Sequence, residues 1–146
     1  MLERTISQQP IHQDVLRYGG TVLVIDTDPL DLDTYADVFR SLGQTVARCD
    51  SYREAMHQIR SEHFELVVLD QGGDDFEGSV VLKFMSDLGI HVPVIALARQ
   101  KTMQCYLEAM ELGAEDYFEK PVSPAEISRV VTACILARIF SGALRE

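Results

Sequence analysis

Five short apolar runs alternate with five segments of helical period along this chain, and this alternation limits the fold more than any other feature. Two of the runs, Glu65–Leu69 and Val92–Ala98, are apolar on both faces. Parallel strands that are covered by helices on each side have this pattern. The remaining strands are expected at Thr21–Asp26, near Thr45–Cys49 and at Glu115–Phe118.

The segments between these runs carry the start and stop signals of helices. Pro29 opens the first helix and Gly43 closes it, while Ser51-x-x-Glu54 forms a capping box before the second. The third is expected from about Ser79 to Leu88. The fourth is expected over about Thr102–Leu112, and the last begins with a capping box and a proline at Ser123-Pro124-Ala125-Glu126. Helical spacing predicts core positions for four residues of the fourth helix, which are Met103, Tyr106, Leu107 and Met110.

Right-handed crossovers between these elements predict an α/β fold with a doubly wound parallel sheet of five strands. For five βα units the natural arrangement is the flavodoxin-like (βα)5 fold with strand order 2-1-3-4-5. The first and third strands are then neighbours. Because ligands bind beyond the carboxyl ends of such strands, the side chains at these ends are the candidate functional groups.

Composition excludes several classes of function. The chain has 146 residues, 13 basic and 23 acidic, for a net charge of −10, and a nucleic-acid-binding surface would need clustered Lys and Arg instead. The three cysteines, Cys49, Cys105 and Cys134, suggest no disulfide framework, and we interpret all three as small core residues. The sequence shows neither a signal peptide nor an apolar run long enough to span a membrane, so the expected location is the cytoplasm.

Chemically useful side chains follow three of the apolar runs. Asp26 ends the first, Asp70 ends the third, and Lys120 follows the fifth in a Lys120-Pro121 step. The strand order brings Asp26 and Asp70 together by topology alone. Carboxylate oxygens suit a hard cation such as Mg²⁺, and an ammonium suits a phosphate oxygen, so the pattern predicts a site for a divalent cation and a phosphoryl group.

These residues resemble the receiver domain of two-component response regulators. The resemblance covers roughly residues 20–140, with residues 1–20 as a tail or linker, 21–141 as the receiver domain and 142–146 as a tail or the start of a connector. The acidic end of the first strand, the spacing from Asp70 to Gly78, and the Lys120-Pro121 step carry it together.

The resemblance implies roles for individual residues. Asp70 would be the phosphoacceptor, taking the phosphoryl group from a histidine kinase or phosphotransfer protein, and Lys120 would contact a phosphate oxygen. Asp26, Asp70 and the backbone carbonyl of Gly72 would hold Mg²⁺. Tyr117 would be the aromatic switch residue, although it can equally be a core residue, and the Lys120–Pro121 bond would be cis. Such a chain is a phosphoacceptor module and not an enzyme in the ordinary sense.

Two positions depart from the family pattern. The second acidic position after the first strand holds Thr27, which removes one negative charge from the expected cation site, and Asp28 lies one residue further along. Ala98 stands where the family has a Ser or Thr that bonds the phosphoryl group, and Arg99 follows it. An alternative is therefore a degenerate receiver that acts as a protein-interaction domain without phosphorylation.

Two other classes compete with the receiver interpretation. Asp26-Thr27-Asp28 also fits the D-x-D motif of haloacid-dehalogenase-type phosphatases, with Asp26 as nucleophile, but that hypothesis leaves Asp70 unexplained. A flavodoxin-like cofactor binder would need a phosphate-cradling loop after the first strand, which is missing.

The last helix has more apolar length than the receiver core needs, with Ile139, Phe140 and Leu144 beyond it. This length indicates either a helix end folded back on the sheet, or a dimer contact or connector. The family's usual partner surface is helix four, strand five and helix five, through which a homodimer can form.

Overall fold

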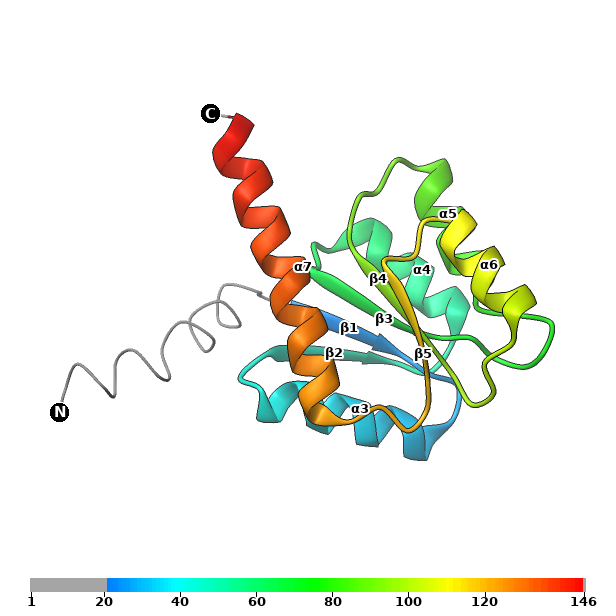
Figure 1. Cartoon of the computed structure of the whole chain (residues 1–146). Helices are drawn as coiled ribbons and strands as arrows, with labels where there is room; N and C mark the ends of the chain where they lie inside the picture. The colour runs from blue at the N-terminus through cyan, green and yellow to red at the C-terminus, as the bar shows by residue number, and fades with distance from the viewer. Residues whose placement is uncertain (1–20, 146) are drawn as a thin grey trace, which may run out of the picture.

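The computed structural model describes residues 21–145 and contains one sheet of five parallel strands with helices on both sides (Figure 1). The strand order is β2-β1-β3-β4-β5, so the predicted α/β fold and its order 2-1-3-4-5 are confirmed. The strands are β1 (Thr21–Ile25), β2 (Thr45–Cys49), β3 (Leu66–Asp70), β4 (Val94–Ala98) and β5 (Asp116–Glu119). The predicted tail, residues 1–20, lies outside the described residues.

Five helices follow the five strands in turn. They are α3 (Pro29–Ser41), α4 (Tyr52–Ser61), α5 (Ser79–Asp87), α6 (Met103–Glu111) and α7 (Pro124–Arg145). Helices α4, α5 and α6 cover one face of the sheet through a core that includes Leu23, Val67 and Ala96. Helices α3 and α7 cover the other face, against Val24 and Val68. Every residue of β3 and β4 is buried, as expected for strands between two helical layers.

The expected helix caps are present. The Ser51 hydroxyl accepts the Glu54 amide at the start of α4, and the Ser123 hydroxyl accepts the Glu126 amide at 3.1 Å. Gly43 follows α3 with φ +87°, a left-handed conformation that favours glycine. Strand boundaries shift by a residue or two from the predicted ones. The largest shift is at β4, which begins at Val94 because Pro93 has no N–H to give to a strand ladder.

The prediction for the core face of α6 was wrong in part. Met103 is 70% exposed and Leu107 is 56% exposed, whereas Cys105 and Ala109 are buried. The small Cys105 and Ala109 side chains, four residues apart, face the sheet, and this rotates the larger apolar residues away from it. Tyr106 and Met110, also predicted to be core, are partly buried.

Helix α7 begins on the sheet and continues beyond it to Arg145 (Figure 1). Ile127 and Val131 are buried against the core, while Cys134 is only half-buried, so its assignment as a core residue was wrong. Leu136, two residues further on, is partly buried and still packs against this core. Ile139 and Leu144 lie outside the described side chains, and Phe140 is 62% exposed.

Within residues 21–145, none of the helices has the length and apolar character that crossing a membrane requires.

Candidate functional site

Asp26, Asp70 and Lys120 meet at the carboxyl edge of the sheet. The Lys120 Nζ atom lies 2.7 Å from Asp26 Oδ2 and 2.8 Å from Asp70 Oδ1. The three side chains are almost completely buried, at 7%, 4% and 10% exposure for Lys120, Asp26 and Asp70. The convergence expected from the strand order is therefore present, although these three residues are separated by up to 94 positions in the chain.

The strand register explains how this convergence arises. Ile25 in β1 pairs with Leu69 in β3, so the residues that follow them, Asp26 and Asp70, lie side by side. The Lys120 amide donates to the Ala98 carbonyl at 2.7 Å, which fixes the chain after β5 beside the end of β4. The Lys120–Pro121 peptide bond is cis, as the family resemblance implied.

A third carboxylate binds the same ammonium. Asp31, in the first turn of α3, lies 2.9 Å from Lys120 Nζ and is 27% exposed. We call Asp26, Asp31 and Asp70 the carboxylate cluster. At the sequence level Asp31 was assigned no role in the site. The position of α3 directly after β1, at the same edge of the sheet, was the available signal that its first turn reaches the site.

The carboxylate oxygens of Asp26 and Asp70 all have hydrogen-bond donors. Besides Lys120, the Asp28 amide donates to Asp26 Oδ1 at 2.9 Å and the Gly72 amide donates to Asp70 Oδ2 at 3.0 Å. Burial raises the pKa of Asp26 above its ordinary value, although the hydrogen bonds from Lys120 and the Asp28 amide oppose this. Burial would lower the pKa of Lys120, but hydrogen bonds to the three carboxylates together raise it. Lys120 is therefore charged at neutral pH.

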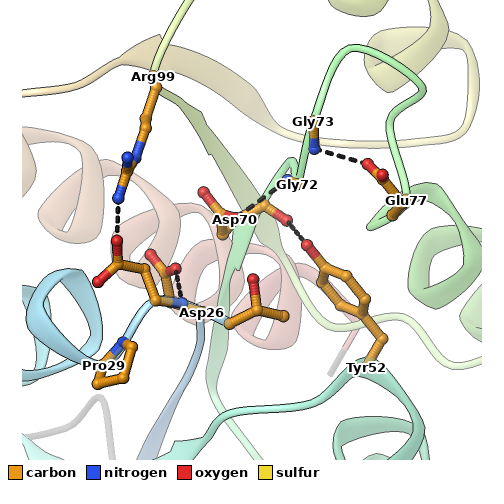
Figure 2. A pocket seen from close by; sticks show the side chains of 10 residues that line it. Asp26, Pro29, Tyr52, Asp70, Gly72, Gly73, Glu77 and Arg99 are labelled. Carbon is orange, nitrogen blue, oxygen red and sulfur yellow. Dashed lines mark hydrogen bonds and ion pairs between the residues drawn. The ribbon is translucent and has the colours of Figure 1, made fainter.

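An open pocket of about 600 Å³ lies over Asp26 and Asp70 (Figure 2). Its other lining residues include Tyr52, whose hydroxyl donates to the Asp70 carbonyl at 3.0 Å, and Glu77, which accepts the Gly73 amide at 2.6 Å. We call it the strand-end pocket. The full lining is Asp26, Thr27, Asp28, Pro29, Tyr52, Asp70, Gly72, Gly73, Glu77 and Arg99.

Thr27 and Asp28 lie on the rim of this pocket. Thr27 is exposed and brings a hydroxyl but no charge. Asp28 is the N-cap of α3, where its side chain accepts the Leu30 amide at 2.9 Å and the Asp31 amide at 3.4 Å, and it also pairs with Arg99. These amide hydrogen bonds, with Arg99 a smaller contribution, lower the pKa of Asp28. The Asp28 carboxylate is therefore engaged by the amides at the start of α3 and by Arg99.

The two candidate switch positions occupy adjacent strands. Ala98, at the end of β4, is fully buried and presents only a methyl group. Tyr117, in β5, is 1% exposed, and its hydroxyl donates to the side-chain oxygen of Gln71, the residue after Asp70. Burial raises the pKa of Tyr117 to about 12. Gln71 was missed at the sequence level, because nothing in a Gln after a strand marks it as a partner for a distant tyrosine.

Gly78 is required by the close approach of the loop to the end of β3. Its amide donates to the Gln71 carbonyl at 2.9 Å, and a Cβ at this position would lie 2.5 Å from the Asp70 carbonyl oxygen. A side chain here would push the loop away from Asp70. This is a physical reason for a glycine eight residues after the aspartate.

The residues fit Mg²⁺ by donor type. Asp26 and Asp70 offer carboxylate oxygens, which hard cations prefer, and the Gly72 carbonyl is a third candidate donor. Between residues 21 and 145, however, no group of three or more His, Cys, Asp or Glu residues is arranged to hold a metal ion. Thr27 adds no charge, and Lys120 is already paired with Asp26 and Asp70, so part of the negative charge that a cation would meet is neutralised.

Comparison with known proteins identifies a matching family. The sequence model of the response regulator receiver domain family matches residues 22–132 of this chain. The transcriptional regulatory protein ZraR of Escherichia coli K12 is 31% identical over 101 residues, which is 69% of this chain and 23% of that protein. The response regulator SaeR of Staphylococcus epidermidis is 27% identical over 106 residues, which is 73% of this chain and 46% of that protein. The chain thus spans less than half the length of these relatives.

Solved structures agree on the fold. The signal receiver domain of a LuxO repressor protein from Vibrio parahaemolyticus has a TM-score of 0.78 at 19% identity, covering 86% of this chain and 97% of that chain. The receiver domain of the Francisella response regulator 1452 has a TM-score of 0.74 at 24% identity, and the match covers 81% of this chain and 98% of that chain. At these identities the structures establish the flavodoxin-like receiver fold alone.

Proposed function

The chain belongs to the response regulator receiver domain family of two-component systems, and from this premise we propose that Asp70 accepts a phosphoryl group from the phosphohistidine of a histidine kinase or phosphotransfer protein. The observation that carries the proposal is the position of Asp70. It ends β3 beneath the strand-end pocket, with the Lys120 ammonium 2.8 Å from one carboxylate oxygen.

The proposed reaction needs positioning and charge compensation more than covalent chemistry by the protein. A carboxylate oxygen of Asp70 attacks phosphorus, and the P–N bond breaks with its electron pair going to the donor nitrogen. The donor imidazole, already protonated on its other ring nitrogen, leaves as the neutral ring. The Gly72 amide and Lys120 hold the Asp70 carboxylate in place, and the Lys120 ammonium offsets negative charge on the phosphoryl oxygens.

When bound, Mg²⁺ supplies further neutralisation of the charge on the phosphoryl group, and Asp26, Asp70 and the Gly72 carbonyl are the residues that would hold it. The chain is then a phosphoacceptor module and not a turnover enzyme. Its proposed partners are the phosphoryl donor and a downstream protein, including a second copy of this chain through α6, β5 and α7.

One alternative function keeps support from specific residues. Thr27 and Ala98 remove a carboxylate and a hydroxyl that the family uses, and Lys120 is paired with three carboxylates. These features favour a degenerate receiver that binds partners without phosphate. The phosphatase hypothesis is not retained, because the chain belongs to the receiver family and Asp28 caps α3.

Intact mass spectrometry after incubation with acetyl phosphate and Mg²⁺ tests the proposal. Wild type should gain the mass of one phosphoryl group, Asp70→Asn should gain none, and Asp75→Asn, an exposed acid of the following loop, should behave as wild type. Chelation of Mg²⁺ should slow the reaction. No adduct on wild type at high Mg²⁺ would replace the proposal with the degenerate receiver.

A further inference from the structure

Arg99 lies on the rim of the strand-end pocket, directly after the buried end of β4. Its guanidinium donates to Asp28 and lies 3.4 Å from Asp31 Oδ2. Figure 2 shows the Arg99 side chain running along the side of the pocket that holds Asp26 and Asp70. A flexible cation is thus held at the opening through which a phosphoryl donor would enter.

Arg99 and Lys120 converge on one oxygen atom. Lys120 Nζ lies 2.9 Å from Asp31 Oδ2, the same oxygen that Arg99 Nη2 approaches at 3.4 Å, and Lys120 Nζ also lies 2.8 Å from Asp70 Oδ1. Both cations therefore lie around one anionic oxygen close to the Asp70 carboxylate, and Arg and Lys are the side chains that bind phosphate oxygens through charge-assisted hydrogen bonds. The guanidinium adds a planar fork of donors to the point charge of the ammonium.

The present contacts of Arg99 are of a kind that is readily exchanged. Its side chain is 65% exposed, and exposed ion pairs contribute little free energy because water and salt screen them. Lys120 differs, with 7% exposure and three carboxylate partners. Arg99 can therefore leave Asp28 and Asp31 at little cost, whereas Lys120 is fixed.

Ala98 lacks the hydroxyl that in the family bonds the phosphoryl group. The Ala98 methyl group cannot hydrogen-bond a phosphoryl oxygen, and Arg99 is the next residue of the chain at the same edge of the sheet. We propose that Arg99 binds the phosphoryl group on Asp70 as a second cation beside Lys120, supplying the contact that Ala98 cannot make. This inference rests on the proposed phosphorylation of Asp70 and assigns Arg99 a direct contact with the transferring group.

The test compares four forms of the full chain in the acetyl phosphate reaction with Mg²⁺. They are wild type, Arg99→Gln, Arg99→Lys and Arg48→Gln. Arg48 is a matched control, because it is an exposed arginine of β2 paired with an aspartate, Asp33, and does not line the pocket. Loss of one charge-assisted contact should slow adduct formation on Arg99→Gln about tenfold or more. Arg99→Lys keeps the charge but loses the fork, so its rate should fall between the two.

A second measurement separates the phosphoryl contact from any effect on folding or on acetyl phosphate itself. Beryllofluoride binding in the presence of Mg²⁺, followed by calorimetry, should weaken about tenfold in Arg99→Gln and stay unchanged in Arg48→Gln. Far-UV circular dichroism confirms that each variant is folded.

The outcomes distinguish this inference from the proposed function. If wild type is phosphorylated while Arg99→Gln and Arg48→Gln match it in rate and in beryllofluoride affinity, the role of Arg99 is refuted and phosphorylation of Asp70 stands. If wild type gains no phosphoryl group and binds no beryllofluoride, both proposals fail together.

Discussion

Replacement of Lys120 by methionine tests the electrostatic account of the site. Methionine keeps most of the length of the lysine stem but removes the ammonium that now lies between Asp26 and Asp70, at 2.7 and 2.8 Å. Asp31, the third partner, is 27% exposed and can turn to water. Asp26 and Asp70, at 4% and 10% exposure, cannot, so the variant leaves two buried carboxylates without their cation.

The expected loss is large for a domain of this size. Removing one partner of a buried ion pair costs about 3–5 kcal/mol, because the other charge stays buried without compensation. A domain has roughly 5–15 kcal/mol of net stability in total. The midpoint of thermal unfolding should therefore fall by roughly 10–20 °C in Lys120→Met.

The loss should depend on pH in a defined direction. Burial raises the pKa of Asp26, so between its ordinary value of 3.8 and the raised value the folded chain binds more protons than the unfolded chain. Stability then falls as pH rises through that window. Without the ammonium, the pKa of Asp26 rises further and the window extends toward neutral pH. The penalty of Lys120→Met should thus be greatest near pH 7 and smaller near pH ~4.5.

Urea unfolding followed by far-UV circular dichroism measures this penalty, since the chain has no tryptophan. Lys83→Met, at an exposed position of α5, is the control for loss of a lysine. The double variant Lys120→Met with Asp70→Asn should recover part of the loss, because one buried charge is gone. A penalty below about 1 kcal/mol at pH 7, the range of exposed pairs, or one that does not change with pH, would refute the buried-cluster account.

Three further substitutions test other parts of the site. Gly78→Ala should destabilise the chain by about 1–3 kcal/mol in urea unfolding, since its Cβ would lie 2.5 Å from the Asp70 carbonyl oxygen; an unchanged midpoint would contradict the close approach. Tyr117→Phe should cost about 1 kcal/mol by loss of the hydrogen bond to Gln71, and a neutral result would show that this bond contributes no net stability. Thr27→Asp should raise Mg²⁺ affinity in calorimetric titration, because it adds a carboxylate at the pocket rim; equal affinity would place position 27 away from the cation.

The sequence was sufficient for the fold because the signals agreed at every level. Apolar runs of strand length, capping residues such as Ser51 and Ser123, and the closing glycine at position 43 all pointed to the same five βα units. The exception was α6, where spacing favoured Met103 and Leu107 as core residues. Two faces of that helix are apolar, and the small Cys105 and Ala109 allow closer packing on the sheet, a preference that depends on neighbours and cannot be read from one helix alone.

For the site, the sequence predicted the residues that the strand order brings together, but not the contacts that depend on side-chain reach. Asp26, Asp70 and Lys120 follow strands, so their meeting at one sheet edge was predictable. Asp31 reaches Lys120 from a helix, and Gln71 reaches Tyr117 through a buried hydrogen bond. Both contacts depend on side-chain reach in three dimensions, for which sequence spacing carries no signal.

Thr27 and Arg99 change the charge of the site in one direction. Thr27 brings no carboxylate to the rim, and Arg99 adds a guanidinium to the same pocket, so the lining is less negative than it would be with an acid at position 27, although Asp26, Asp28, Asp70 and Glu77 keep it acidic. The smaller negative charge weakens the attraction for Mg²⁺ and reduces the repulsion of an incoming phosphoryl group. If the proposed function holds, weaker Mg²⁺ binding and a phosphoryl contact from Arg99 are two consequences of one change in charge. The two should therefore respond together: Thr27→Asp combined with Arg99→Gln should raise the Mg²⁺ dependence of phosphorylation above that of either single variant.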